Sequence, residues 1–268
     1  MFKLKKISII LLYFLVIIYA VEILLYLFLS NDQRSLINIK EKRIEIAKKK
    51  NIKFDIRTGL EVYISEYKKN ENLYIPFYFN KTYAQLKSVK KNLDNQILVP
   101  FRGPINKQTL SCAEDLNYKI INNDKYGFKN PNSIYEKNID LFLIGDSYTE
   151  GLCENEKNDT AGHLRSLGFN SINFGITGAG PLTSLAVIRE YLTNFKPKFV
   201  VYQYFEGNDL RDLNWEKNTY LKKYLKSNFS LNYLDHQKKI QTFLENFQKE
   251  RHFEITNQEI SKSNDIGE

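Results

Sequence analysis

Three short apolar runs between residues 139 and 204 constrain the fold more than any other feature of the sequence. The runs are Ile139–Ile144, Ser171–Phe174 and Phe199–Tyr204, and their length and content of β-branched and aromatic residues are typical of strands. Residues 157–167 and Leu182–Phe195, which separate them, have the pattern of helices. Because strands that alternate with helices form parallel sheets covered by helices, the sequence predicts an α/β fold.

A cluster of glycine and polar residues follows each predicted strand. The clusters are Gly145-Asp146-Ser147, Asn173–Pro181 ("NFGITGAGP") and Glu206–Asp209 ("EGND"). Ligands bind at the carboxyl ends of the strands in open parallel sheets. Three such clusters at one edge of the sheet therefore predict a binding or catalytic site.

Each cluster also has an ordinary structural interpretation. Glycine and aspartate are frequent turn residues, so Asp146, Gly175 and Gly180 fit turns that have no further role. Ser147 and Asn208 both fit the N-cap of a helix, a position that favours these residue types. Taken together, the three clusters favour a functional site over three unrelated turns.

In combination the clusters resemble the sequence blocks of the SGNH (GDSL-type) hydrolases, serine esterases and acyl-transferring enzymes with a three-layer, flavodoxin-like fold. The matching residues are Gly145, Asp146 and Ser147 in the first block, Asn173, Gly175 and Gly178 in the second, and Gly207, Asn208 and Asp209 in a shortened third. The resemblance covers about residues 139–215, and Asn123–Phe128 resembles the lead-in of membrane-anchored bacterial members.

The resemblance implies a hydrolase of ester bonds that uses no metal and no cofactor. Ser147 would be the nucleophile, and its backbone N–H, the backbone N–H of Gly178 and the side-chain amide of Asn208 would form the oxyanion hole. Fixed donors of this kind stabilise the negative charge of the tetrahedral intermediate. The implied substrate is a small-molecule, carbohydrate or lipid ester. The formal charge of +8 permits nucleic-acid binding, but no nucleic-acid-binding motif accompanies it, so we expect none.

The base that would activate the serine is not evident in the sequence. The family places a histidine in an Asp-x-x-His motif near the C-terminus, and none of His163, His236 and His252 has this context. His163 comes too early in the chain. Three explanations stay open: a truncated chain whose fold is incomplete at the C-terminus, a degenerate domain that binds without hydrolysing, and a non-standard arrangement in which His236 or His252 is the base.

The N-terminal segment Ile7–Ser30 contains 24 residues and a single charge, that of Glu22. A helix of this length spans about 36 Å, enough for the roughly 30 Å hydrocarbon core of a membrane. The run is longer than the core of a signal peptide, and no small-residue cleavage site follows it. We therefore predict an uncleaved transmembrane anchor over 1–30, a helical juxtamembrane stalk over 31–70 and a hydrolase-like domain over 71–268, with its core at 139–215.

The two cysteines, Cys112 and Cys153, allow one intramolecular disulfide. Nothing in the sequence fixes their separation, so two free thiols are the alternative. Lysines flank the apolar segment on both sides and leave the orientation of the anchor open. Disulfides persist outside the reducing cytoplasm. A bridge would therefore place a single-pass membrane protein with its domain on the periplasmic or extracytoplasmic side.

Overall fold

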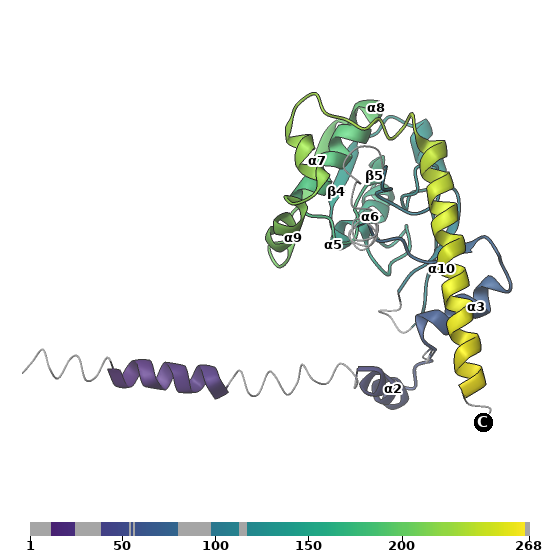
Figure 1. Cartoon of the computed structure of the whole chain (residues 1–268). Coiled ribbons are helices and arrows are strands. Elements are labelled where there is room, and N and C mark those ends of the chain that lie inside the picture. Colours follow the sequence, from purple (N-terminus) through teal and green to yellow (C-terminus); the bar gives the residue numbers. More distant parts are fainter. Residues whose placement is uncertain are drawn as a thin grey trace, which may run out of the picture. The chain divides into compact units, whose positions relative to one another are not determined.

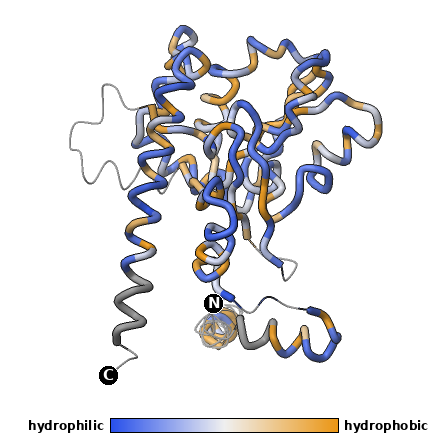
Figure 2. Tube along the Cα trace, turned by 90° about the vertical axis from the view of Figure 1, so that its right-hand side faces the viewer, coloured by the Kyte–Doolittle hydropathy of each residue, from blue (hydrophilic) through white to orange (hydrophobic). Residues whose placement is uncertain are grey.

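The computed structural model describes residues 12–24, 39–53, 55, 57–79, 98–112 and 117–265, which fall into two units, Met1–Ile56 and Arg57–Glu268. In the first unit, residues 12–24 form a helix (Figure 1). This helix is mainly hydrophobic (Figure 2), and its large apolar side chains are exposed. Among the helices of the described residues, none has the length and apolar content needed to cross a membrane. The predicted anchor Ile7–Ser30 extends beyond the described residues on both sides.

The predicted helical stalk over 31–70 is not continuous. Helix α2 (Ile39–Lys49) ends just before Asn51, whose φ of 51° is left-handed. Helix α3 (Gly59–Tyr67) starts afresh at Thr58, which accepts a hydrogen bond from the Glu61 backbone N–H while the Glu61 carboxylate accepts one from the Thr58 N–H. Helix α3 belongs to the second unit. The break between the two helices therefore lies within the predicted stalk, where a capping box restarts the helix without a proline.

The main sheet contains three parallel strands in the order β5-β4-β6. They are β4 (Leu141–Gly145), β5 (Ser171–Asn173) and β6 (Phe199–Gln203), with Leu141 opposite both Ser171 and Phe199. The helices around them are α5 (Ser147–Glu150), α6 (Thr160–Ser166), α7 (Pro181–Val187), the π-helical turn η4 (Ile188–Leu192), α8 (Thr193–Phe195) and α9 (Asp209–Glu216). The predicted α/β fold with a small parallel sheet is confirmed.

A second, smaller sheet forms in the segment that the sequence presents only as a lead-in. Its order is β1-β2-β3, built from β1 (Leu73–Tyr74), β2 (Gln108–Leu110) and β3 (Ile120–Asn122). Strands β1 and β2 are parallel, and β2 and β3 are antiparallel. The remaining elements are η3 (Asn132–Glu136), η5 (Tyr220–Leu225) and the long helix α10 (Gln237–Asp265), which passes beside α3 (Figure 1).

The core lies around β4, the central strand of the main sheet. Phe142 and Leu143 are completely buried, and Phe142 stacks on Phe174 with ring centroids 4.7 Å apart. Strand β6 differs, because Phe199 is 66% exposed and its three neighbours Val200, Val201 and Tyr202 are also exposed. β4 pairs with one edge of β6, while the other edge has no partner strand among the described residues.

The carboxylate of Glu216, at the end of α9, caps the start of α7. It is fully buried and accepts hydrogen bonds from the backbone N–H groups of Gly180, Leu182 and Thr183 at 2.8–3.0 Å. The Thr183 hydroxyl donates to it as well. Burial raises the pKa of the Glu216 carboxyl, while these donors oppose the rise. The cap fixes the turn between β5 and α7, which contains the second polar cluster.

We predict that Glu216→Ala lowers the free energy of unfolding by about 2–4 kcal/mol, because the buried N–H groups lose their acceptor. Denaturant unfolding followed by circular dichroism measures the change. Glu136→Ala, at an exposed side chain, is the control and should stay within about 0.5 kcal/mol of the parent. A Glu216→Ala protein within that same margin would contradict the capping role.

Candidate functional site

The first and second polar clusters meet at the carboxyl edge of the main sheet. The Ile176 N–H donates to the Gly145 carbonyl at 3.0 Å. The N–H and hydroxyl of Thr177 both donate to the Glu150 carboxylate, at 2.7 and 2.6 Å. Glu150 is in turn paired with Arg102 at 2.7 Å. Helix α5, which carries Ser147, is therefore held to the turn that follows β5.

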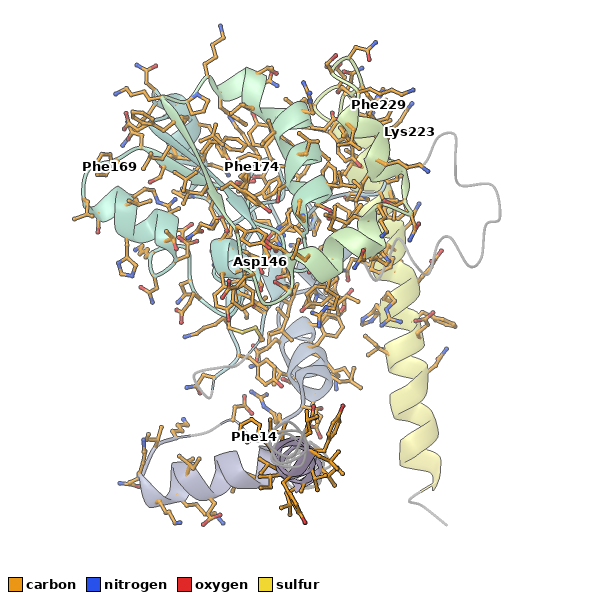
Figure 3. The ribbon with its side chains drawn as sticks, turned by 90° about the vertical axis from the view of Figure 1, so that its left-hand side faces the viewer. Phe14, Asp146, Phe169, Phe174, Lys223 and Phe229 are labelled. Carbon is orange, nitrogen blue, oxygen red and sulfur yellow. A yellow bond between two sulfur atoms is a disulfide. The ribbon has the colours of Figure 1, made fainter. Side chains whose placement is uncertain are left out.

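The first and third clusters also lie close together. The Tyr148 and Phe205 rings are in contact, with centroids 4.6 Å apart. The charge of Asp209 raises the pKa of the Asp146 carboxyl, and a hydrogen bond from the Asn208 side chain lowers it. Asp146 is buried in the second unit, directly after β4 of the main sheet (Figure 3). The three clusters that the sequence groups therefore converge around α5.

Ser147 is the first residue of α5 and does not cap it. The N-cap is Asp146, whose Oδ1 accepts from the Tyr148 N–H at 2.9 Å. Ser147 is half-buried, and its hydroxyl makes no hydrogen bond within the part of the chain that the structure describes. Because α5 has only four residues, its dipole adds little to the positive potential near Ser147. Any stabilisation of an oxyanion there depends on individual donors.

Two glycines of the second cluster have different roles. Gly178 has a φ of 75°, a left-handed conformation that glycine adopts without strain. Gly175 is more than a turn glycine, because a Cβ there would lie 2.2 Å from the Glu150 backbone nitrogen. Its missing side chain lets the second cluster approach α5. Gly178, which the family resemblance indicates as an oxyanion donor, lies in the turn of the second cluster, and Gly175 sets the distance between the two segments.

Asn173 has a structural role. Its side-chain amide donates to the Thr149 carbonyl at 2.6 Å and to the Asp159 carboxylate at 3.1 Å. Its backbone N–H donates to Asn130, whose own amide donates to the Asn173 carbonyl. Both polar ends of Asn173 therefore hold β5 to its neighbours, and none of these groups is free to bind a ligand.

Asn208 occupies the N-cap position of α9 without forming the side-chain bond of a cap. Its Oδ1 is buried and has no hydrogen-bond partner, and the same is true of Asp146 Oδ2 and Asp209 Oδ1. The other oxygen of Asp209 accepts from the Phe205 N–H at 2.9 Å and the Tyr202 hydroxyl at 3.3 Å. Unpaired buried acceptors are unfavourable. This edge of the sheet has spare acceptors, and a ligand or side chain that donates hydrogen bonds would satisfy them.

The pKa of Asp146 is raised. Burial is the largest cause, and the neighbouring charge of Asp209 adds to it, while the Tyr148 N–H and the Asn208 side chain oppose the rise.

The histidines lie elsewhere. His252 is on α10, where its Nδ1 is 3.2 Å from the Tyr63 hydroxyl and its ring lies against Tyr67, with centroids 4.2 Å apart. His236 directly precedes α10, and His163 is exposed on α6. None of the three hydrogen-bonds Ser147, so the structure does not bring the candidate bases His236 and His252 to the candidate nucleophile.

Residues that precede β4 are linked to the site by hydrogen bonds of Asp124 and Asn130. The sequence indicates a role for this region only through the resemblance of Asn123–Phe128. Asp124 accepts from the Phe128 N–H, from Asn130 and from the Tyr135 hydroxyl at 2.6–2.9 Å. Burial raises the pKa of its carboxyl against these donors. The Asn130 side chain in turn makes two hydrogen bonds with the backbone of Asn173. Sequence reasoning missed Asn130, Arg102 and Glu150, because their partners are far from them along the chain.

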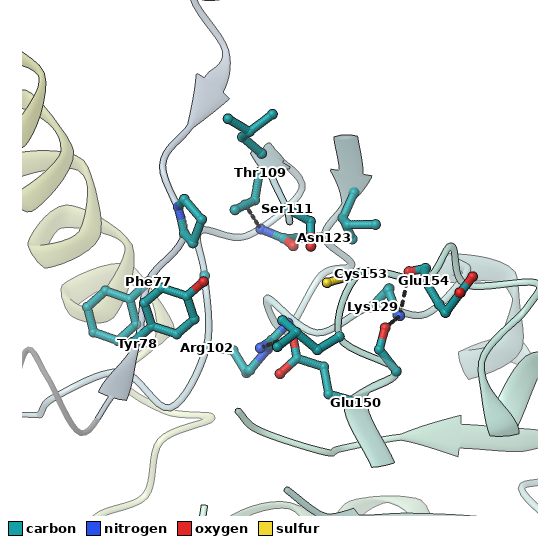
Figure 4. Close-up of a pocket in the computed structure, with 16 residues that line it drawn as sticks. Phe77, Tyr78, Arg102, Thr109, Ser111, Asn123, Lys129, Glu150, Cys153 and Glu154 are labelled. Atoms are coloured by element: carbon teal, nitrogen blue, oxygen red, sulfur yellow. Dashed lines mark hydrogen bonds and ion pairs between the residues drawn. The ribbon is translucent and has the colours of Figure 1, made fainter. Parts of the chain in front are cut away.

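Cys112 and Cys153 form a disulfide, with Cα atoms 4.9 Å apart. A cavity lies beside it, lined by Tyr78, Arg102 and Glu150 among others (Figure 4). Ser147 is not among its lining residues. The cavity is therefore separate from the edge of the sheet on which the three clusters converge.

The chain matches none of the protein-family models, curated proteins or solved structures with which it was compared.

We predict that the stability of the protein depends on the proton of Asp146. A raised folded-state pKa favours folding below the unfolded value of about 3.9, and this contribution is lost as the pH rises through the raised value. Asp146→Asn removes the titration. In denaturant unfolding between pH 4 and 7, the parent should therefore lose more stability than Asp146→Asn.

Asp140→Asn supplies a control of opposite sign. A hydrogen bond from Lys198 lowers the pKa of Asp140, so its contribution grows as the pH rises above the lowered value. The parent should therefore gain stability relative to Asp140→Asn on going from pH 2 to 5. Identical pH profiles for Asp146→Asn and the parent would show that Asp146 keeps its ordinary pKa.

Proposed function

We propose that the protein is a serine hydrolase of ester bonds, similar to the SGNH hydrolases, with Ser147 as its nucleophile. The observation that carries the proposal is the convergence of the three strand-end clusters around α5. In the described chain, the Ser147 hydroxyl makes no hydrogen bond. An SGNH-like arrangement of the sheet is part of this proposal, and the order β5-β4-β6 supports it.

In the proposed reaction, Ser147 Oγ attacks the ester carbonyl carbon, and its proton passes through a water molecule to the oxygen of the alcohol that leaves. The oxyanion is stabilised by backbone N–H groups of Ser147 and Gly178 and by the Asn208 amide. The ester C–O bond then breaks, and the alcohol leaves with a proton. Water hydrolyses the acyl-enzyme and restores Ser147. The substrate is a small-molecule, carbohydrate or lipid ester, and no metal or cofactor takes part in these steps.

A second candidate function is non-catalytic binding. It is favoured by a specific observation, namely that no histidine of the described chain reaches Ser147. A serine without a base is a weak nucleophile. In this alternative, the acceptors Asp146 Oδ2 and Asp209 Oδ1 bind a ligand that donates hydrogen bonds, such as the hydroxyl groups of a carbohydrate.

Hydrolysis of a short-chain aryl ester and labelling by a fluorophosphonate distinguish the two candidates. If the protein is an esterase, Ser147→Ala should abolish both, and Asn208→Ala should lower kcat by about 10²–10³-fold, as expected for the loss of one oxyanion donor. Ser166→Ala, at an exposed serine on α6, is the control and should behave as the parent. Turnover by Ser147→Ala at the parent rate would refute the nucleophile. A parent that shows neither reaction would favour the binding function.

We also propose that Ile7–Ser30 anchors the protein in a membrane, with its domain outside the cytoplasm. The exposed apolar side chains of residues 12–24 support the anchor, and the disulfide supports the oxidising side. After an alkaline carbonate wash, the full-length protein should stay with the membrane fraction and keep its N-terminus. Release into the supernatant, or a mature N-terminus beyond Ser30, would refute the anchor.

A further inference from the structure

Positive charge is concentrated in the segment that contains helix α2. Residues 39–53 hold seven lysine and arginine residues against two glutamates, so more than half of the formal charge of +8 lies there. A run of charges on a helix is usually no more than a solvated face. Two apolar side chains set this segment apart from that ordinary case, because Ile46 and Ile52 are 49% and 45% exposed.

The turn that ends α2 places the two isoleucines on neighbouring parts of the surface. Asn51 is left-handed, with a φ of 51°, and its N–H donates to the Lys48 carbonyl at 3.2 Å. The Ile52 N–H donates to the Ala47 carbonyl at 2.9 Å. This pair of hydrogen bonds is a Schellman motif, which turns the chain back over the last turn of a helix. Ile52 therefore lies beside the turn that contains Ile46.

Exposed lysines accompany the two isoleucines. Lys49 and Lys50 follow Ile46 by three and four residues, and the Lys50 N–H donates to the Ile46 carbonyl at 2.9 Å, so both lie one turn away on the same side. Lys53 directly follows Ile52. Lys50 and Lys53 have no ion-pair partner among the described residues. We call Ile46, Lys49, Lys50, Ile52 and Lys53 the Ile46 patch.

We propose that the Ile46 patch binds the anionic headgroups of the membrane in which Ile7–Ser30 is anchored. Apolar side chains among lysines suit a membrane interface, where the apolar groups enter the boundary between headgroups and acyl chains and the lysines contact anionic lipids. A nucleic acid fits less well, because its phosphates would pair with the lysines but leave the isoleucines in water. This inference rests on the proposed anchor.

The length of chain between the proposed anchor and α2 permits the contact. Ile39 follows Ser30 by nine residues, which span at most about 32 Å. The attraction of lysines to an anionic surface decays within a Debye length of about 8–10 Å. A short tether keeps α2 close to the surface and so raises its effective concentration there.

A fluorescent reporter on the full-length protein tests the contact. Ile46→Cys protein, labelled with the fluorophore NBD, is reconstituted into vesicles whose headgroups carry a spin-label quencher. The two native cysteines are bonded to each other and do not take the label. Quenching should be several-fold stronger in vesicles that contain phosphatidylglycerol than in pure phosphatidylcholine. Salt at about 1 M, where the Debye length is about 3 Å, should remove the difference.

Glu45→Cys, labelled in the same way, is the matched control. Glu45 is exposed, lies about 100° around the helix from Ile46, and pairs with Lys49 at 2.8 Å. Removing its negative charge strengthens the attraction to an anionic surface, so weaker quenching at 45 than at 46 reports which side of α2 meets the lipid. Equal quenching at the two positions would overturn the proposal.

Charge reversal separates the patch from the net charge of the protein. Lys50→Glu/Lys53→Glu, combined with the reporter at 46, should reduce the quenching with phosphatidylglycerol to its level in phosphatidylcholine. Lys222→Glu/Lys226→Glu makes the same change of charge at exposed lysines of the second unit and should leave the quenching unchanged. Equal effects of the two double variants would contradict a role of the patch.

A reporter in the anchor keeps the two proposals apart. Labelled Val16→Cys should be quenched by lipids spin-labelled in their acyl chains, whatever the headgroup. If Val16 is quenched and Ile46 is not, the patch proposal fails and the anchor stands, and if only Ile46 is quenched, the lipid contact stands and the anchor fails. An Ile46 reporter that responds to added DNA and not to phosphatidylglycerol would assign the patch to nucleic acid and overturn the proposal.

Discussion

The position of β4 between two parallel partners is the constraint on which the rest of the second unit depends. β4 is buried over nearly its whole length, and its register with β5 and β6 places the carboxyl ends of all three strands at one edge. The polar clusters lie there because parallel strands in register end at the same edge of the sheet. Gly175 then allows the second cluster to contact α5 directly. The candidate site is thus a consequence of strand pairing and of the close approach that Gly175, which has no side chain, permits.

The buried carboxylates at this edge of the sheet have fewer hydrogen-bond donors around them than buried carboxylates elsewhere in the molecule. Elsewhere in the molecule, buried carboxylates such as those of Asp124 and Glu216 are surrounded by donors. Asp146 and Asp209 each have one oxygen without a partner. Native proteins leave few buried polar atoms unsatisfied. The carboxylates near Ser147 therefore differ from the other buried carboxylates of the molecule in the donors around them.

The local features of the fold could be predicted from the sequence, and the distant ones could not. The alternating apolar and helical patterns between 139 and 204 give the parallel strands and their polar ends, because both arise from neighbouring residues. The cap that Glu216 supplies to α7 joins residues more than 30 positions apart, and no local pattern marks it. The pairing of β1, β2 and β3 into a small sheet was not predicted, because strands of only two or three residues carry no pattern that identifies their partners. The break before α3 depends on Thr58 and Glu61, which a charge-rich segment conceals.

The same division applies to the candidate site. Ser147, Gly178 and Asn208 could be named as candidates from the sequence because each follows a predicted strand. Arg102, Asn130 and Glu150, which hold that edge together, belong to segments whose approach only the folded chain reveals. The lack of a histidine near Ser147 agrees with the missing Asp-x-x-His motif, and the contact of His252 with Tyr63 gives that residue a packing role.

The disulfide has a topological consequence for the site. Cys112 and Cys153 are 41 residues apart, and the covalent ring that they close contains β3, β4 and Ser147. A protease that cuts the backbone once anywhere inside this ring opens it without releasing a fragment, since the sulfur bridge still joins the two pieces. Ser147 therefore stays tethered to both halves of the molecule after a single cleavage, as long as the surroundings keep the bridge oxidised.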